Sequence, residues 1–555
     1  MVPDLTAKMN YEVPSKWKKS EKKPKPKQIE KRTICQRIKL MTINKPIFVA
    51  LFFTLFPLAF FLLDFINYSR AAKIAITGMT TIGLLYTLSK KYNTSSFLKY
   101  LLVIVSFILF LNLSFQAGLR DIFGVAQDEM MIMKAIFGTD MQESYEFLLQ
   151  YRHFLTKHIL ILIFSFFVFY FMALRESIKA DIVIIGKFVL VAWMLFFLVG
   201  HLEKSIRRGS PFVYFPHFYA EWKAELKEVN KLNELLKDNI NHKSMSDIKY
   251  IGKGKKNTVV WVIGESSTKY NWSLYGYDRQ TTPLLDSIQD ELLVFDNINA
   301  AAPITVPAFE RMFTQATIKK PELWKKEPNI IQIAKKAGYH TYWISNHTTD
   351  AHNGITYIFA NHADENYMTN RGKARGEGSY DASVLPAYKK ALADPYDKKL
   401  ILVHLLGSHP AYNFRYPKEY AKFTETFDDK TAKELSDKGI DKWAIGFRNL
   451  YDNSILYGDY IRYTLLKLLQ NSKDAKHSSW LYHPDHGEDV CHHNNFSGHN
   501  KNVKEQWEIP MVFWSYMPQE TDTHINYRLD IINSTVLGLL KLETEHYDSR
   551  DDIFY

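Results

Sequence analysis

Six acidic and histidine residues stand at or just after the ends of apolar runs in the second half of this sequence. They are Glu265, His404, His409, Asp485, His486 and Glu488. Any one of them has an ordinary explanation, such as a carboxylate at a helix N-terminus or a histidine that makes one hydrogen bond. Together they offer the hard oxygen and nitrogen ligands that suit zinc or a similar divalent ion. Their like charges would repel one another without a cation, so the pattern favours a metal site.

A metal site for catalysis needs a reacting group, and Thr305 is a candidate. It lies in the segment NAAAPITVPAFERMFTQAT, where small residues and Pro303 precede it and Pro307 follows near the first turn of a predicted helix. The pattern predicts Thr305 at a helix N-cap, where exposed backbone N–H groups favour an anion such as phosphate. The alternative is a threonine that only caps the helix.

These residues need a scaffold that brings strand ends together, and the sequence from residue 258 onward predicts one. Short strand-like runs, among them TVVWVIG, HTYWIS, KKLILVHLLG, SWLYH and IPMVFW, alternate with helical stretches such as residues 449–469. This alternation predicts an α/β domain with a mostly parallel central sheet covered on both faces. Ligands of such sheets bind beyond the carboxyl ends of the strands.

The first 210 residues have a different character, because they contain apolar runs long enough to cross a membrane. The five runs are residues 46–66, 71–88, 98–119, 158–174 and 182–202. The second is the least apolar, since a lysine and several threonines dilute it. The first follows a long tail and precedes further spans, so it is predicted to be an uncleaved anchor. An N-terminal polytopic helical membrane domain is therefore expected.

The distribution of charge predicts the topology. Residues 1–46 carry thirteen lysines and arginines against four acids, which accounts for most of the net charge of +11. A basic segment beside a first span is typical of the cytoplasmic side, so no nucleic-acid partner is inferred. Five crossings place the rest of the chain outside. The expected organisation is a basic cytoplasmic tail (1–45), a five-helix membrane domain (46–205), amphipathic linker helices (206–250) and an exported catalytic domain (251–555).

Two smaller features complete this organisation. Residues 212–239 have an amphipathic helical pattern, which fits a helix on the bilayer surface or a linker packed on the exported domain. Cys35 and Cys491 are the two cysteines, and the topology places them on opposite sides of the membrane. No disulfide within the chain is expected, so the exported domain is expected to depend on the size of its core.

Several segments resemble the phosphoethanolamine transferases of Gram-negative inner membranes, in the alkaline phosphatase and sulfatase superfamily, and the lipopolysaccharide-core type looks closest. They are VIGESSTKYNWSLYGYDRQTTPLL, APITVPAFERMF, KKAGYHTYWISNH, LVHLLGSHPAYNFRYP and HPDHGEDV, within residues 257–515. The resemblance implies a sulfatase-like catalytic domain. It also implies transfer of phosphoethanolamine from phosphatidylethanolamine to lipopolysaccharide, on a core sugar or lipid A, through a covalent intermediate on a zinc-activated threonine.

Roles for individual residues follow from this resemblance. It implies zinc ligands at Glu265, Thr305, Asp485 and His486, with Thr305 as the nucleophile and a second divalent ion as an option. His409 and His499, the latter in FSGHNKN, look like the histidines that bind the substrate phosphate. Asn346, His347 and Glu488 are expected to contribute to substrate binding.

Two departures from the family pattern bear on these expectations. Pro484 stands before the Asp-His pair where the family usually has serine, with little effect expected on ligation. Members that modify lipid A carry several disulfides, which this chain lacks, and this favours core sugars as the acceptor.

Other functions remain open from the residues alone. A sulfatase of the same superfamily expects an arginine four places after its nucleophile, which is missing after Thr305. A phosphoglycerol transferase fits the residues as well. A non-catalytic membrane scaffold is the alternative of another class.

Overall fold

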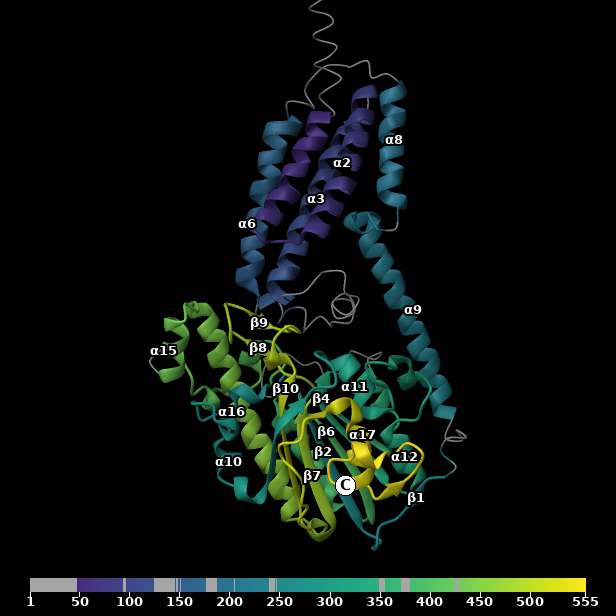
Figure 1. Cartoon of the computed structure of the whole chain (residues 1–555), viewed down its shortest axis with the longest axis vertical. Helices are drawn as coiled ribbons and strands as arrows, with labels where there is room; N and C mark the ends of the chain where they lie inside the picture. Colours follow the sequence, from purple (N-terminus) through teal and green to yellow (C-terminus); the bar gives the residue numbers. More distant parts are fainter. Residues whose placement is uncertain are drawn as a thin grey trace, which may run out of the picture.

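The chain forms a bundle of apolar helices and a separate α/β domain, which a long helix connects (Figure 1). The computed structural model describes residues 47–92, 96–123, 145, 148–149, 151–175, 187–203, 205–238, 245, 247–348, 355–370, 380–424 and 429–555. The predicted basic tail and Cys35 lie outside these residues.

The α/β domain is built on an eight-stranded sheet. In spatial order the strands are β11 (Tyr527–Arg528), β3 (Leu293–Asn299), β10 (Glu508–Ser515), β7 (Ser478–Pro484), β2 (Asn257–Gly264), β6 (Lys398–His404), β4 (His340–Thr348) and β5 (Glu365–Asn370). All neighbours are parallel except β10, which runs antiparallel to both β3 and β7. The predicted, mostly parallel sheet is therefore confirmed.

Helices cover both faces of this sheet, because successive side chains of its strands point to opposite faces. Trp261 of β2 packs into one core with helices α11 (Thr305–Phe313), α12 (Ile330–Lys336), α13 (Ile355–Ala360) and α17 (Ile532–Leu539). Val260 and Val262 pack into the other core with α10 (Pro283–Asp286), α14 (Leu385–Ala393) and α16 (Lys442–Gln470). The helix α15 (Lys430–Asp437) packs against α16. Two short pairs of strands lie outside the sheet: β1 (Lys249–Tyr250) with β12 (Leu542–Glu543), and β8 (Asp489–Val490) with β9 (Ser497–Gly498).

The bundle consists of apolar helices that match the predicted runs. Its longer helices are α2 (Tyr68–Lys91), α3 (Ser96–Phe123) and α6 (Arg152–Phe169), which a π-helical turn extends to Leu174, and a further helix is α8 (Lys187–Leu202). Three segments, Tyr68–Lys91, Ser96–Asp121 and Phe154–Leu174, are long and apolar enough to cross a membrane. The helices Ile47–Leu62 and Phe188–Leu202 are also apolar but shorter within the described residues.

The threonines that dilute the second apolar run have their hydroxyl groups satisfied within α2. Thr77, Thr81 and Thr87 each donate to the carbonyl oxygen four residues earlier, at 2.8, 2.6 and 2.7 Å. A hydroxyl bonded in this way exposes no unsatisfied donor to an apolar surrounding. The threonines are therefore compatible with a membrane span.

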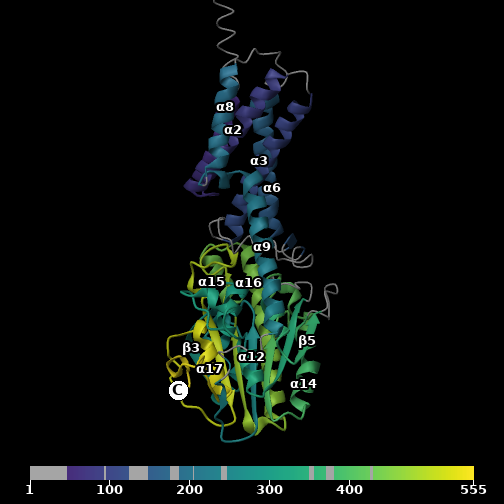
Figure 2. The ribbon, with the colours of Figure 1, turned by 90° about the vertical axis from the view of Figure 1, so that its right-hand side faces the viewer.

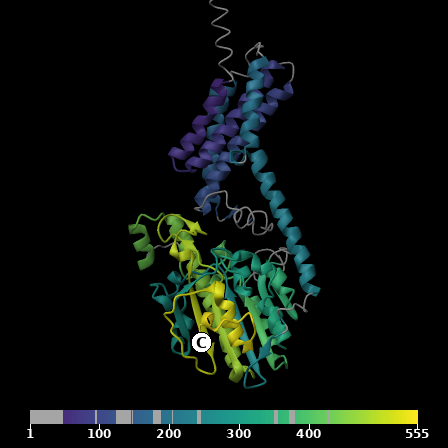
Figure 3. The same ribbon diagram turned by 45° about the vertical axis from the view of Figure 1, so that its right-hand side comes forward.

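The α/β domain presents the carboxyl ends of its parallel strands to the bundle. In Figure 1, α11, β8 and β9 lie at the end nearer the bundle, whereas β1 lies at the far end. The single helix α9 (Pro211–Asp238) covers the predicted amphipathic stretch. Figures 2 and 3 show it running from the bundle down the side of the α/β domain.

Candidate metal and nucleophile site

The register of three central strands brings the predicted residues to one edge of the sheet. Ile263 of β2 pairs with His404 of β6, and Gly264 pairs with Pro484 of β7. The three strands therefore end at the same level. The residues that follow them, beginning with Glu265, meet beyond this edge, as the parallel arrangement predicts.

Four predicted residues form a compact cluster at this edge. The Thr305 hydroxyl lies 3.3 and 3.4 Å from the two carboxylate oxygens of Glu265, and 3.4 Å from Nε2 of His486. His486 Nε2 is also 3.4 Å from a Glu265 oxygen and 3.5 Å from Oδ2 of Asp485. Glu265, Asp485 and His486 are almost fully buried. The structure thus places all four proposed metal ligands within reach of a single ion.

The cluster has the chemistry of a site for a divalent cation. Oδ2 of Asp485 is buried and has no hydrogen-bond partner within the described part of the chain, which is costly unless a cation binds there. Burial raises the pKa of Glu265 well above its usual value, and the neighbouring Asp485 carboxylate raises it further. Burial lowers the pKa of His486, and its Nδ1 lies 2.8 Å from the Gly487 carbonyl oxygen. The Nε2 lone pair then faces the cluster, as in many metal-binding histidines.

Thr305 is the first residue of α11, and Ile304 holds the N-cap position without a side-chain cap bond. The prediction of Thr305 as N-cap is therefore wrong by one residue. The reason is that its hydroxyl turns away from the helix backbone toward Glu265 and His486. The hydroxyl still lies beside a helix N-terminus, which favours an anion bound next to it.

A glycine allows the loops around the cluster to meet. Gly407 has a φ of +53°, and a Cβ at this position would lie 2.9 Å from the backbone nitrogen of Glu265. Ser408 donates its backbone N–H to the Glu265 carbonyl oxygen at 3.1 Å. The GSH loop after β6 therefore fits against the Glu265 backbone only with glycine here.

His499 and Glu488 form a second group beside the first. Nδ1 of His499 lies 2.9 Å from Oε2 of Glu488, and the His499 ring is perpendicular to that of His486 at a centroid distance of 4.9 Å. Burial lowers the pKa of His499, but the Glu488 carboxylate outweighs it and the net shift is upward. Tyr412 donates its hydroxyl to the other oxygen of Glu488 at 2.9 Å. His499 is thus held as a potential proton donor.

His409 lies near these residues at the end of the GSH loop. Its ring is perpendicular to the ring of His347, with the centroids 6.4 Å apart. Burial lowers the pKa of His409 well below its usual value, and the positive charge of Arg415 adds to this effect. Its Nδ1 is buried and has no hydrogen-bond partner among the described residues. A neutral imidazole with a free nitrogen is suited to contact a polar substrate group.

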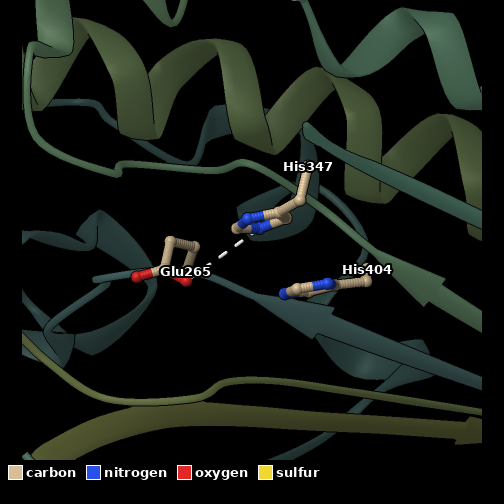
Figure 4. A group of neighbouring side chains, drawn as sticks. All are labelled: Glu265, His347 and His404. Carbon is tan, nitrogen blue, oxygen red and sulfur yellow. Dashed lines mark ion pairs between the residues drawn. The ribbon is translucent and has the colours of Figure 1, made fainter. Parts of the chain in front are cut away.

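His347 and His404 lie beside Glu265 (Figure 4). Nε2 of His347 is 4.0 Å from Oε2 of Glu265 and 3.1 Å from the Leu405 carbonyl oxygen. The two rings are stacked, 3.8 Å apart and within 9° of parallel. Nitrogen lone pairs lie in the plane of each ring, so parallel stacked rings do not direct them at one ion. Glu265, His347 and His404 each offer a ligand atom within 4.8 Å of the others, but the rings would have to turn to share an ion, so a second divalent ion stays a prediction.

The side chain of Asn346 supports a loop. Its amide donates to Asp381 at 2.9 Å, and its oxygen accepts from Ser383 at 2.9 Å. Asp381 in turn accepts the backbone N–H groups of Leu406 and Gly407, at 2.8 and 2.9 Å. Asn346 thus orients the GSH loop, and its contribution to substrate binding stays a prediction.

Three residues absent from the sequence prediction also organise the site. Asp381 and Tyr412 act as described above, and Gln506 donates to the carbonyl oxygens of Pro303 and Gly487 at 2.9 and 2.7 Å. Gln506 thereby joins the segment before Thr305 to the loop after β7. No local motif marks these residues, because each acts through contacts between distant segments.

Comparison with known proteins places this site in a family. The sulfatase family profile matches residues 257–541. The phosphoethanolamine transferase EptC of Escherichia coli (strain K12) is 31% identical over 326 residues, which are 57% of this chain and 54% of that protein. The chain thus spans about half the length of the curated relatives it matches.

Solved structures show the same fold. The C-terminal periplasmic domain of EptC from Escherichia coli, in complex with Zn, is 31% identical with a TM-score of 0.51, over 56% of this chain and 88% of that chain. The integral membrane protein lipooligosaccharide phosphoethanolamine transferase A of Neisseria meningitidis is 19% identical with a TM-score of 0.62, over 93% of this chain and 97% of that chain. The latter shares the arrangement of apolar helices and α/β domain. Since the family profile covers just over half of its residues and the fold agrees, the chain belongs to the sulfatase family.

Proposed function

We propose that this protein transfers phosphoethanolamine from phosphatidylethanolamine to lipopolysaccharide, on a core sugar or on lipid A. It would be a multi-pass protein of the Gram-negative inner membrane with its catalytic domain in the periplasm. One observation carries the proposal: the Thr305 hydroxyl lies within 3.4 Å of Glu265 and His486 at a helix N-terminus. The relative named phosphoethanolamine transferase EptC supports the choice of group.

In the first step, Thr305 attacks the phosphorus of the donor lipid as its alkoxide, after its hydroxyl proton has passed to solvent. A bond forms between the threonine oxygen and phosphorus, and the bond between phosphorus and the diacylglycerol oxygen breaks. His499 donates a proton to the leaving oxygen, since Glu488 favours its charged form. His409, held neutral by burial, contacts the phosphoryl oxygens. Phosphoethanolamine remains on Thr305.

Glu265, Thr305, Asp485 and His486 would hold the metal, which we propose to be zinc. Bound there, zinc lowers the pKa of the Thr305 hydroxyl and offsets the negative charge of the carboxylates. In the second step, an oxygen of the acceptor attacks the phosphorus, the threonine oxygen leaves, and the proton of the acceptor passes to His499. The backbone N–H groups at the start of α11 face the transferring group.

Replacing Thr305 tests the nucleophile. Thr305→Ala should abolish diacylglycerol release from vesicles of phosphatidylethanolamine. With a chelator present it should leave the melting temperature nearly unchanged, because the hydroxyl caps no helix. Thr305→Ser keeps a hydroxyl and should retain measurable release. Mass spectrometry of wild-type protein quenched during turnover should find phosphoethanolamine on the peptide with Thr305. Transfer by purified Thr305→Ala would overturn the assignment.

Donor choice separates the alternatives. With labelled phosphatidylethanolamine, phosphatidylglycerol and an aryl sulfate ester offered in parallel, we expect turnover of the first alone. Turnover of phosphatidylglycerol would identify a phosphoglycerol transferase, and turnover of the sulfate ester a sulfatase. A protein that binds zinc and turns over none of the three would be a scaffold.

A further inference from the structure

The start of α6 contacts the α/β domain close to the candidate site. Tyr151, which directly precedes α6, donates its hydroxyl to the Ser497 carbonyl oxygen at 3.2 Å, and only 3% of Tyr151 is exposed. One turn later, the ring of Phe154 meets the ring of Trp443 edge to face, with centroids 5.1 Å apart. In Figure 1 the lower end of α6, which is its start, lies directly above β8 and β9. An apolar span is thus anchored in the α/β domain by two aromatic residues.

The accepting carbonyl belongs to the strand that leads into His499. Ser497 and Gly498 form β9, which pairs with Asp489 and Val490 of β8. His499 follows β9 directly. Residues on such a short pair of strands are weakly held by the pair itself, because isolated two-stranded pairs are marginally stable. A contact on Ser497 therefore adds to the bonds of Phe496 and Asn500 that hold the segment around His499.

The same strand also contacts Tyr412, which binds Glu488, the partner of His499. Tyr412 lies 3.4 Å from the Ser497 hydroxyl and donates to Glu488 at 2.9 Å. Glu488 in turn faces His499 at 2.9 Å. A continuous series of contacts thus runs from the first residue before α6, through Ser497 and Tyr412, to the pair Glu488 and His499.

We propose that Tyr151 is a positioning residue, whose hydroxyl holds the β8–β9 pair so that His499 faces the transferring group only while the α/β domain is docked on α6. This proposal rests on the proposed function. The donor lipid stays in the bilayer, so the reacting groups must be held at a fixed place relative to the spans. Errors of about 1 Å in such placement cost on the order of a hundredfold in rate.

The test compares Tyr151→Phe with a matched control in the full chain. The control is Tyr100→Phe, which removes the hydroxyl of an apolar-helix tyrosine that is 69% exposed. With phosphatidylethanolamine vesicles, Tyr151→Phe should lower kcat about tenfold with KM within about twofold, which is the pattern of lost transition-state positioning. Zinc content and melting temperature should match those of Tyr100→Phe. An unchanged kcat would overturn the proposal.

A double-mutant cycle shows whether Tyr151 acts through His499. If it does, Tyr151→Phe has no further effect on kcat in a His499→Asn background, because coupled residues are not additive. A full additional loss in that background would mean that Tyr151 acts elsewhere, and would also overturn the proposal.

Hydrogen exchange distinguishes this inference from the proposed function. The backbone amides of the segment with Ser497 and Gly498 should exchange faster in Tyr151→Phe than in wild type, and no faster in Tyr100→Phe. If wild type releases no diacylglycerol, the proposed function fails, and exchange alone then decides whether Tyr151 holds this segment. Equal exchange in wild type and Tyr151→Phe overturns the positioning role in either case.

Discussion

Glu265 is buried beside a second carboxylate, so its contribution to stability depends on whether a metal is bound. With a chelator present, Glu265→Gln should raise the melting temperature, because it removes a buried charge that Asp485 repels. With zinc in excess, the same variant should melt below wild type, since binding at about 100 times Kd stabilises by about 2.7 kcal/mol and the variant loses most of this. Thermal unfolding in the two buffers checks the change of sign. The same order of stability in both would contradict a metal at Glu265.

His483 gives the α/β domain a pH dependence that can be separated from the site. Its ring is fully buried, accepts from the Trp261 indole at 2.8 Å and lies 2.9 Å from the Pro484 carbonyl oxygen. Burial lowers the pKa of His483 to about 4. Unfolded histidine titrates near about 6.5, so the folded state binds fewer protons between these values.

The contribution of His483 to the free energy of unfolding is therefore fully present above about pH 6.5. It is lost as the pH falls through about 4, by about 3 kcal/mol in total. His483→Gln does not titrate in this range. Wild type should lose more stability than this variant between pH 7 and pH 4.5 in thermal unfolding with a chelator. Parallel losses would show that His483 is not buried in its neutral form.

Residues of the site differ in how far the sequence could predict them. Glu265 and Asp485 follow apolar strands, so their position at the carboxyl edge follows from the pattern alone. Gln506 binds a residue 203 positions away along the chain, and Asp381 binds one 25 positions away. Nothing in the local sequence marks such contacts. The stacking of His347 on His404 likewise depends on the register of β4 and β6.

The loop after β6 is the element that holds Glu265 in place. Gly407→Ala forces a side chain into a positive φ and brings Cβ within 2.9 Å of the Glu265 backbone. A suitable control is Gly439→Ala, where φ is +80° and no atom lies within 4 Å of the added Cβ. The control should cost about 1 to 2 kcal/mol. Gly407→Ala should cost more and lower the zinc content, measured by elemental analysis. Equal costs with full zinc content would show that the close approach is unimportant.

Strands with an apolar run in their interior were predictable, and strands interrupted by polar residues were not. β2, β6 and β7 are buried on both faces, and each has an apolar run in its interior. β5 carries polar residues at the edge of the sheet, and β3 contains the exposed Asp296, so neither gave a signal. The antiparallel direction of β10 is set by its neighbours, and its register shifts at Pro510, which has no N–H to donate.

For the whole molecule, the number of crossings stays a prediction. Five crossings place Tyr92 and Arg175 in the cytoplasm and Phe123 outside. If only Tyr68–Lys91, Ser96–Asp121 and Phe154–Leu174 crossed, Phe123 would lie inside and Arg175 outside. Fusions of a reporter that is active only outside the cytoplasm, made after each of these three residues, should show activity after Phe123 alone. Activity after Arg175 would contradict the five-span organisation.

The division of the molecule into two parts was predictable, but their contact was not. The two parts can be told apart in the sequence, because a helix that spans a bilayer needs a longer apolar run than a strand in a folded core. The hydrogen bond from Tyr151 to Ser497 joins residues 346 positions apart. Such a contact depends on how two finished parts meet, which no local pattern encodes.

The helix α9 has 28 residues and is therefore about 40 Å long. It runs from the bundle part of the way down one side of the α/β domain, while Tyr151 and Phe154, before and in α6, contact the end of this domain that lies nearer the bundle (Figure 3). The helix α9 and the contact of α6 thus both fix the distance between the reacting edge and the apolar helices. A turn added to α9 would strain the contact between α6 and the α/β domain. The length of α9 and the position of this contact must therefore change together.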